Sequence, residues 1–186
     1  MRLFLGIRIP NTIRDSLQKF KTALTTPDEN VKWIAPDNLH LTLKFFGEVE
    51  QTRLETLENA LHQSVIDQKR FSLQVQGTGF FPREQKAKVL WAGIQDPSNG
   101  LNKIADSIEK FSVQAGFPPN DNPFSAHLTM ARFSSPPAAV FLEKIRSYRS
   151  FLFGEMEVKE FFIIQSQLRS SGSDYTLLKK FDLNVH

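Results

Sequence analysis

Two short segments of the chain carry the same histidine-containing pattern. The first begins at His40 and reads His-Leu-Thr-Leu, and the second begins at His127 and reads His-Leu-Thr-Met. In a β-strand, side chains two residues apart project from one face, about 6.5–7 Å apart along the chain. Each segment therefore places an imidazole beside the hydroxyl of Thr42 or Thr129, while the intervening leucine points into the core.

Two such strands, side by side, would present groups suited to chemistry at phosphorus. One imidazole can remove a proton from the attacking nucleophile while the other protonates the departing oxygen. The two hydroxyls can donate hydrogen bonds to the non-bridging oxygens, where negative charge is held. A single tripeptide of this kind is typical of any strand with a polar face, and two histidines without a third ligand are a poor metal site. The repetition favours a shared catalytic site without a metal or cofactor.

The elements that must position these segments follow from the hydrophobic pattern. Apolar residues at helical spacing, typified by Ile13, Leu17, Phe20 and Leu24, alternate along the chain with period-two segments. There is no glycine-rich nucleotide loop, and residues typical of turns separate neighbouring strands, which favours an α+β fold with antiparallel or mixed sheets and helices packed on them. The pattern predicts strands over 2–9, 31–34, 38–47, 71–75, 88–94, 126–133, 158–168 and 175–183, and helices over 11–24, 54–65, 101–111 and 137–148.

Composition limits the class of protein. A chain of 186 residues with 40% hydrophobic residues and 17 phenylalanines supplies a core for one compact domain. The absence of cysteine from the sequence excludes disulfides, zinc-thiolate sites and thiol nucleophiles. No signal peptide or apolar run of about 18 residues is evident, so we expect a cytoplasmic protein that does not enter a membrane. The net charge of +3 is compatible with an anionic ligand but does not demand one.

The residues around the two histidines resemble those of a known family. The chain looks like an RNA 2',3'-cyclic phosphodiesterase of the two-histidine phosphoesterase superfamily, whose bacterial and archaeal members are also described as RNA 2',5'-ligases. The segments that carry this resemblance are Arg2-Leu3-Phe4-Leu5-Gly6-Ile7, Val31-Lys32-Trp33-Ile34, Asn38-Leu39-His40-Leu41-Thr42-Leu43-Lys44-Phe45-Phe46-Gly47-Glu48-Val49, His127-Leu128-Thr129-Met130-Ala131-Arg132, Ser166-Gln167-Leu168 and Tyr175.

The resemblance implies a fold, a reaction and a partner. The expected fold is bilobal and pseudo-twofold, with two antiparallel sheets facing a central groove and helices packed outside. The expected reaction opens the 2',3'-cyclic phosphate end of RNA to a 2'-phosphate, with His127 as the base that activates water and His40 as the acid that protonates the 3' oxygen. The expected protein is a monomer without a cofactor, acting on RNA ends, with tRNA halves as one candidate substrate.

Further substrate-binding candidates are less specific. Arg132 resembles a family position near the phosphate, although strand parity places it opposite His127 unless a bulge or strand end intervenes, and a surface arginine is the alternative. Phe46 and Lys44 share parity with His40 and are predicted to supply a stacking surface and a charge, with core packing as the alternative for Phe46. Tyr175 resembles a family position near the ligand, or else packs on its sheet.

Other aromatic and histidine residues have weaker signals. Trp33 and Phe124 precede the motif strands and are candidates for flanking the groove, although aromatic residues usually fill cores. His62 and His186 lack the motif and are expected to be non-catalytic. Members of the family often carry Arg-Pro just before the second motif, where this chain has Ser125 and Ala126. A cation near the groove is therefore absent from that position.

Two other functions stay open from sequence alone. One is the joining of RNA halves through a 2',5' bond, in which an RNA hydroxyl replaces water. The other is a non-catalytic module that only holds phosphate ends. Intact His-x-Thr motifs argue against the second of these.

Overall fold

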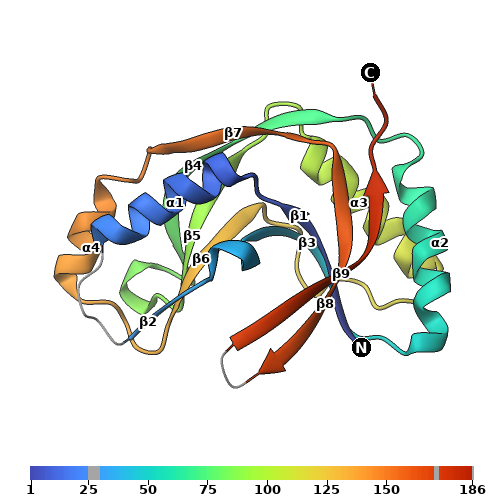
Figure 1. Ribbon diagram of the computed structural model, residues 1–186, viewed down its shortest axis with the longest axis horizontal. Coiled ribbons are helices and arrows are strands. Elements are labelled where there is room, and N and C mark those ends of the chain that lie inside the picture. The colour runs from blue at the N-terminus through green and yellow to red at the C-terminus, as the bar shows by residue number, and fades with distance from the viewer. Residues whose placement is uncertain (25–29, 170–171, 186) are drawn as a thin grey trace.

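The computed structural model describes residues 1–24, 30–169 and 172–185, which form a strand-rich fold with four α-helices (Figure 1). Short 3₁₀ helices, Pro36–Asn38, Gln51–Arg53 and Glu84–Lys86, lie between the longer elements. Those elements are β1 (Arg2–Arg8), α1 (Asn11–Leu24), β2 (Val31–Trp33), β3 (His40–Glu48), α2 (Leu54–Val65), β4 (Phe71–Phe81), β5 (Val89–Gln95), α3 (Gly100–Gln114), β6 (His127–Phe133), α4 (Ala139–Arg146), β7 (Leu152–Val158), β8 (Glu160–Arg169) and β9 (Gly172–Asp182).

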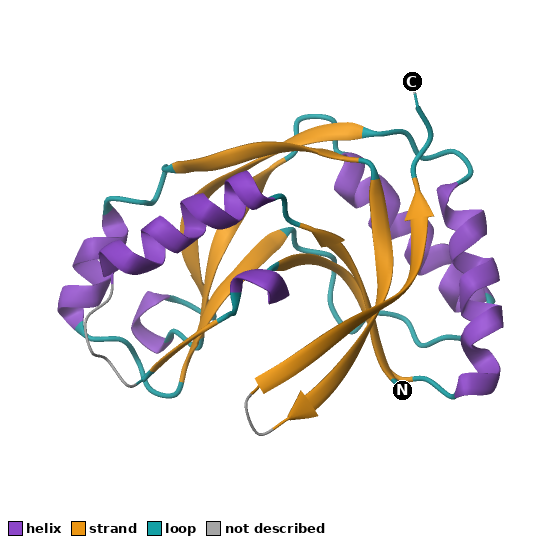
Figure 2. Ribbon diagram, viewed as in Figure 1, coloured by secondary structure: helices purple, strands orange, loops and turns teal. Residues whose placement is uncertain are grey.

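The strands form one curled antiparallel sheet (Figure 2). Its order is β7-β4-β5-β6-β3-β1-β8-β9, and β2 pairs with β6 beside this path. Within the described residues, β3 and β6 pair at Leu41 and Leu128, which joins the two halves of the sheet. The expected α+β fold with antiparallel strands and outer helices is confirmed, and the two expected sheets are continuous through this pair.

The helices cover the outside of the curled sheet in two pairs. In Figure 1, α1 and α4 lie against one half, and α2 and α3 lie against the other. Each helix has a periodic apolar stripe: α1 buries Ile13, Leu17, Phe20 and Leu24, at the spacing of three or four residues that places them on one face. Among the described residues, the four α-helices therefore pack on the outer side of the sheet, opposite its concave face.

A one-residue bulge follows the motif threonine in both central strands. Along β1 and β3, Gly6 pairs with Thr42 but the next residue, Leu5, pairs with Lys44, so Leu43 is extra. Along β5 and β6, Trp91 pairs with Thr129 but Leu90 pairs with Ala131, which makes Met130 extra. An extra residue reverses which face the following side chains occupy.

One strand is longer than the sequence predicted, and another was not predicted. β4 runs to Phe81 rather than Val75, and β7 pairs with it as an edge strand that the pattern did not predict. Register shifts near Val75 interrupt the alternation in both strands, since they place extra residues within an otherwise regular ladder. In residues 1–24, 30–169 and 172–185, no helix is long and apolar enough to cross a membrane.

Candidate active site

The two motif histidines are held in the same way. The ring Nδ1 of His40 lies 2.7 Å from the backbone oxygen of Asn38, and that of His127 lies 2.8 Å from the backbone oxygen of Ser125. A carbonyl oxygen only accepts, so each Nδ1 carries the proton and donates it. Each ring is thereby oriented by the residue two positions earlier, and its Nε2 is left for a ligand. This role of Ser125 uses its backbone, not its side chain.

Pairing between the central strands brings the two motifs to one face. Leu41 and Leu128 are fully buried partners, so their neighbours project from the opposite, concave face. Continuing this antiparallel register sets His40 across from Thr129 and, reciprocally, the other histidine across from the other threonine. In a regular ladder, diagonal neighbours of this kind lie about 7–8 Å apart. Two imidazoles at that separation can flank one phosphorus atom.

His40 is packed into an aromatic setting. Its ring centroid lies 4.6 Å from that of Phe4 and 5.2 Å from that of Tyr175, which meets it edge-on. Gly6 on β1 lies beneath this cluster, and a Cβ there would be tight against Ile164 at 3.1 Å and Phe4 at 3.3 Å. Burial lowers the pKa of His40 below its usual value, and the hydrogen bond to Asn38 opposes that effect only in part.

His127 lies in a different aromatic setting. Phe81 meets its ring edge-on at 5.0 Å and also lies 5.4 Å from Trp91, which pairs with Thr129. The Trp91 indole occupies the space above Gly79, where a Cβ would come within 2.2 Å of it. Neither Phe81 nor Trp91 was predicted from the sequence. The strand that carries Phe81 was expected to end at Val75, and nothing local marks Trp91, inside the predicted strand 88–94, as a neighbour of the motif.

The bulge in β3 overturns the predicted orientation of Phe46 and Lys44. Phe46 is 7% exposed and packs on Phe117 in the core, and the Lys44 side chain is also buried. Phe45 takes the concave face instead, where it is 63% exposed and lies 5.7 Å from Phe4. The predicted orientation of both residues is wrong because β3 contains an extra residue that simple alternation does not include.

The same bulge in β6 brings Arg132 onto the concave face. Val89 and Trp91 lie on one side of β5 and pair with Arg132 and Thr129, so both residues of β6 share that side. Arg132 is exposed. Simple alternation places Arg132 on the face opposite His127, and the bulge in β6 moves it to the same face.

The remaining aromatic and histidine candidates have no contact with the motif histidines among the described residues. Trp33 packs edge-on against Phe20 of α1, on the core side of β2, so its predicted place beside the groove is wrong. Phe124 is half-buried and packs against the main core, and its place beside the groove stays a prediction. His62 is exposed on α2 with its ring 4.9 Å from Phe181, and His186 lies outside the described residues.

Lys44 links β3 to the segment that leads into β6. Its ammonium donates to the carboxylate of Glu109 on α3 and, over 3.0 Å, to the backbone oxygen of Pro118. The other carboxylate oxygen of Glu109 accepts from the backbone N–H of Asn120 at 2.8 Å. A buried cation thus ties the first motif strand to the approach to the second.

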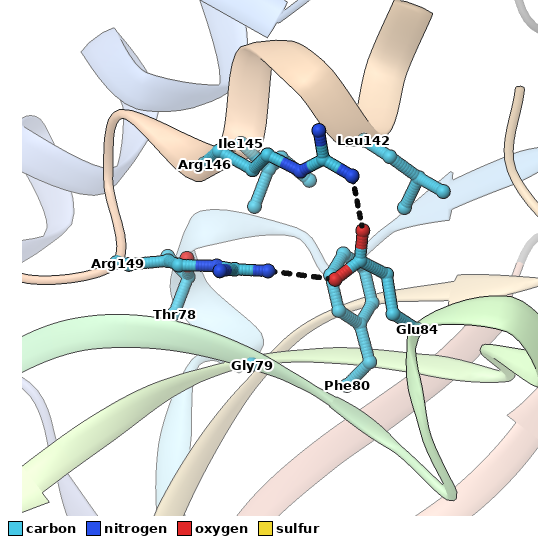
Figure 3. Close-up of a pocket in the computed structure, with 8 residues that line it drawn as sticks. All are labelled: Thr78, Gly79, Phe80, Glu84, Leu142, Ile145, Arg146 and Arg149. Atoms are coloured by element: carbon cyan, nitrogen blue, oxygen red, sulfur yellow. Dashed lines mark hydrogen bonds and ion pairs between the residues drawn. The ribbon is translucent and has the colours of Figure 1, made fainter. Parts of the chain in front are cut away.

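A cavity of about 200 Å³ lies away from the histidines, between α4 and β4 (Figure 3). Its charged lining consists of Glu84, Arg146 and Arg149, and both arginines point at the Glu84 carboxylate, with the Arg149–Glu84 contact at 2.8 Å. The motif residues do not line it. This cavity is a structural junction apart from the candidate site.

The site as a whole offers two imidazoles and two hydroxyls on one concave face. Throughout the described ranges, no three His, Asp or Glu side chains gather as metal ligands would. One ring can accept a proton while the other delivers one, and the hydroxyls can donate to an anion between them. The arrangement suits proton transfer on two sides of a phosphate.

Comparison with known proteins gives full-length similarities. The sequence profile of the family described as LigT like Phosphoesterase matches residues 7–91 and 93–173. A protein of Archaeoglobus fulgidus named RNA 2',3'-cyclic phosphodiesterase is 34% identical over 182 residues, covering 98% of this chain and 100% of that protein. A protein of Methanothermobacter thermautotrophicus with the same name is 30% identical over 98% of this chain and 99% of its own length.

Solved structures agree with these sequence matches. The protein TT0787 of Thermus thermophilus superposes with a TM-score of 0.83 at 30% identity, covering 98% of both chains. Escherichia coli LigT in complex with 3'-AMP superposes with a TM-score of 0.81 at 28% identity, covering 98% of this chain and 97% of that one. The resemblance noted from the motif residues is confirmed, and the chain belongs to the LigT-like phosphoesterase family.

Proposed function

We propose that this protein hydrolyses the 2',3'-cyclic phosphate end of RNA to a 2'-phosphate end, using His40 and His127 as a metal-independent acid/base pair. The observation that carries the proposal is the Leu41–Leu128 pairing, which sets both imidazoles and both threonines on one concave face. Relatives that match nearly the whole chain are named RNA 2',3'-cyclic phosphodiesterase, which supports the choice of substrate.

The proposed reaction is one displacement at phosphorus. Nε2 of His127 takes a proton from water as the water oxygen bonds to phosphorus. The bond between phosphorus and the 3' oxygen breaks, and Nε2 of His40 protonates that oxygen. Thr42 and Thr129 donate hydrogen bonds to the non-bridging oxygens, which carry the negative charge of the pentacoordinate transition state.

The pKa of His40 bears on this assignment. Burial lowers that pKa, so at neutral pH the ring of the free protein is mainly neutral, whereas an acid must start protonated. A bound cyclic phosphate carries a negative charge, and an anion beside an imidazole raises its pKa. Substrate binding therefore supplies the condition under which His40 acts as the acid.

The same pair can serve the reverse transesterification. An RNA half with a 5'-hydroxyl, in place of water, would yield a 2',5' linkage by proton transfers at the same two rings. Incubation of tRNA halves with the protein, followed by quantification of joined and hydrolysed products, gives the ratio of the two reactions. Hydrolysis in excess of joining supports the proposed function, and joining in excess makes ligation the principal activity.

Single substitutions test the proposed site. We expect His40→Ala and His127→Ala each to lower kcat by roughly 100- to 10,000-fold on an oligonucleotide with a cyclic phosphate end, the range for loss of a general acid or base. The assay contains a chelator, and the position of the product phosphate is determined. His62→Ala serves as the matched control, since it removes an exposed histidine of α2.

Three outcomes would contradict the proposal. Full activity in both motif variants would remove the histidines from the mechanism, and loss of wild-type activity in chelator would require a metal. A wild-type protein that binds the cyclic end at every pH without opening it would be the non-catalytic RNA-binding module instead. Circular dichroism of each variant verifies that the fold is retained.

A further inference from the structure

Two exposed cations face each other across β2 and β6. The register pairs Lys32 directly with Arg132. The neighbours of Lys32 on β2, Val31 and Trp33, are partly buried against the main core, so Lys32 projects from the opposite, concave face. Both charged side chains therefore lie on the face that carries the two histidines.

This placement is unfavourable without an anion. Like charges directly opposite each other in an antiparallel pair destabilise the sheet. Among the described residues, neither Lys32 nor Arg132 forms a salt bridge with an acidic side chain. Other exposed lysines of the sheet, such as Lys180 with Glu160 and Asp182, do have such partners. An unneutralised cation pair beside a phosphate-handling site indicates a place for a second anion.

The distance from the motif limits what that anion can be. Arg132 and Thr129 pair with Val89 and Trp91, which are two residues apart on β5, so the cation pair lies about 7 Å along the strand from the threonine. A single nucleotide can bridge a span of that order. The next phosphate of an RNA chain ending in a cyclic phosphate is the one on the 5' side of the terminal nucleoside.

We propose that Lys32 and Arg132 bind the internucleotide phosphate immediately 5' of the terminal nucleoside, which makes this protein selective for RNA chains over nucleoside 2',3'-cyclic phosphates. The proposal rests on the proposed function and extends it by naming the part of the chain that the site recognises. A nucleoside cyclic phosphate has no second phosphate, so only an oligonucleotide gains this contact.

The kinetic test compares one substrate of each kind. Lys32→Gln and Lys32→Gln/Arg132→Gln are assayed with uridine 2',3'-cyclic phosphate and with a short oligouridylate that ends in the same group. We expect the ratio of kcat/KM for the oligonucleotide to that for the mononucleotide to fall about tenfold in Lys32→Gln, the scale of one charged hydrogen bond. Lys19→Gln, on the exposed face of α1, is the matched control and keeps the wild-type ratio.

A binding measurement reads the same contact without catalysis. Fluorescence anisotropy gives the affinity of a labelled oligouridylate with a 2'-phosphate end over a range of salt concentrations. Each lost phosphate contact should make the slope of log affinity against log salt less steep by about 0.7, the value for single strands. The melting temperature of Lys32→Gln should equal or exceed that of the wild type, since one of two opposed charges is gone.

The outcomes separate this proposal from the proposed function. A reduced salt slope in the variants supports the phosphate contact, and it does so even where the wild-type protein opens no cyclic phosphate, a result that would reject the proposed function alone. An unchanged salt slope overturns the contact. Equal losses on the mononucleotide and the oligonucleotide also overturn it, because the cations would then act on the terminal phosphate.

Discussion

Strands β3 and β6 have the same local structure in different surroundings. In both, the histidine donates its Nδ1 proton to the carbonyl two residues before, and a bulge follows the threonine. Around His40 the neighbours are Phe4 and Tyr175, and burial lowers its pKa. Around His127 the neighbour is the edge of Phe81. The motif sets the orientation of a ring, while the partner strands set what packs around it.

The two strands differ again beyond the bulge. Four residues after each histidine, the chain buries Lys44 in β3 and Ala131 in β6. Five residues after, it exposes Phe45 in one strand and Arg132 in the other. One side of the concave face is therefore apolar and the other cationic. Equivalent backbone positions carry different chemical groups, which gives a pseudo-symmetric site two distinct ends.

The largest effect tests what the strands share. We expect Thr42→Val and Thr129→Val each to lower kcat by about 100-fold or more, since each removes a donor to the charged oxygens at nearly constant volume. Turnover of uridine 2',3'-cyclic phosphate measures this, with Thr56→Val on the exposed face of α2 as the control. A large loss in one variant and none in the other would show that the two threonines are not equivalent.

The next effect concerns a position where the strands differ. Lys44→Ala should lower the free energy of unfolding by about 3 kcal/mol, because it leaves Glu109 without its cationic partner and opens space in the core. Lys44→Met, which refills the space, should cost less. Urea denaturation measures both. Equal stability of Lys44→Ala and the wild type would mean that this ion pair does not secure β3 to α3.

The smallest effect is a shift in pH dependence. With His40 as the acid, kcat/KM falls as its ring loses the proton, at a pH below the usual value near 6.5 because burial lowers its pKa. The corresponding fall in kcat should occur at higher pH, since the bound phosphate raises the pKa of His40. Profiles from about pH 4 to 9 cover this fall in rate with rising pH, which should be absent from His40→Ala. A rise of kcat/KM with pH through that low pKa would instead make His40 the base.

The lowered pKa of His40 also makes the folding stability depend on pH. The unfolded chain protonates His40 near the usual pKa, and the folded chain only at lower pH. The stability associated with the neutral ring is therefore present above the usual pKa of 6.5 and is lost as pH falls through the folded pKa. Thermal melts of the wild type and His40→Ala across this range should diverge on the acid side.

Much of the fold followed from periodicity. The helical stripe of α1 and the alternation around His40 led to correct elements, because burial of one face demands a regular spacing of apolar residues. Strand β7 escaped prediction, since Gly154 and a register shift interrupt its pattern. Phe46 was misplaced for a related reason: a bulge adds one residue that no local pattern announces.

The repeated histidines and threonines were recognisable in the sequence because chemistry selects residue types and strand geometry selects their spacing of two. Their meeting at Leu41 and Leu128, the burial around His40 and the pairing of Lys32 with Arg132 come from contacts between segments far apart in the chain. Such contacts depend on which strands become neighbours and in what register. Local spacing carries no information about either, since both are settled by packing of the whole core.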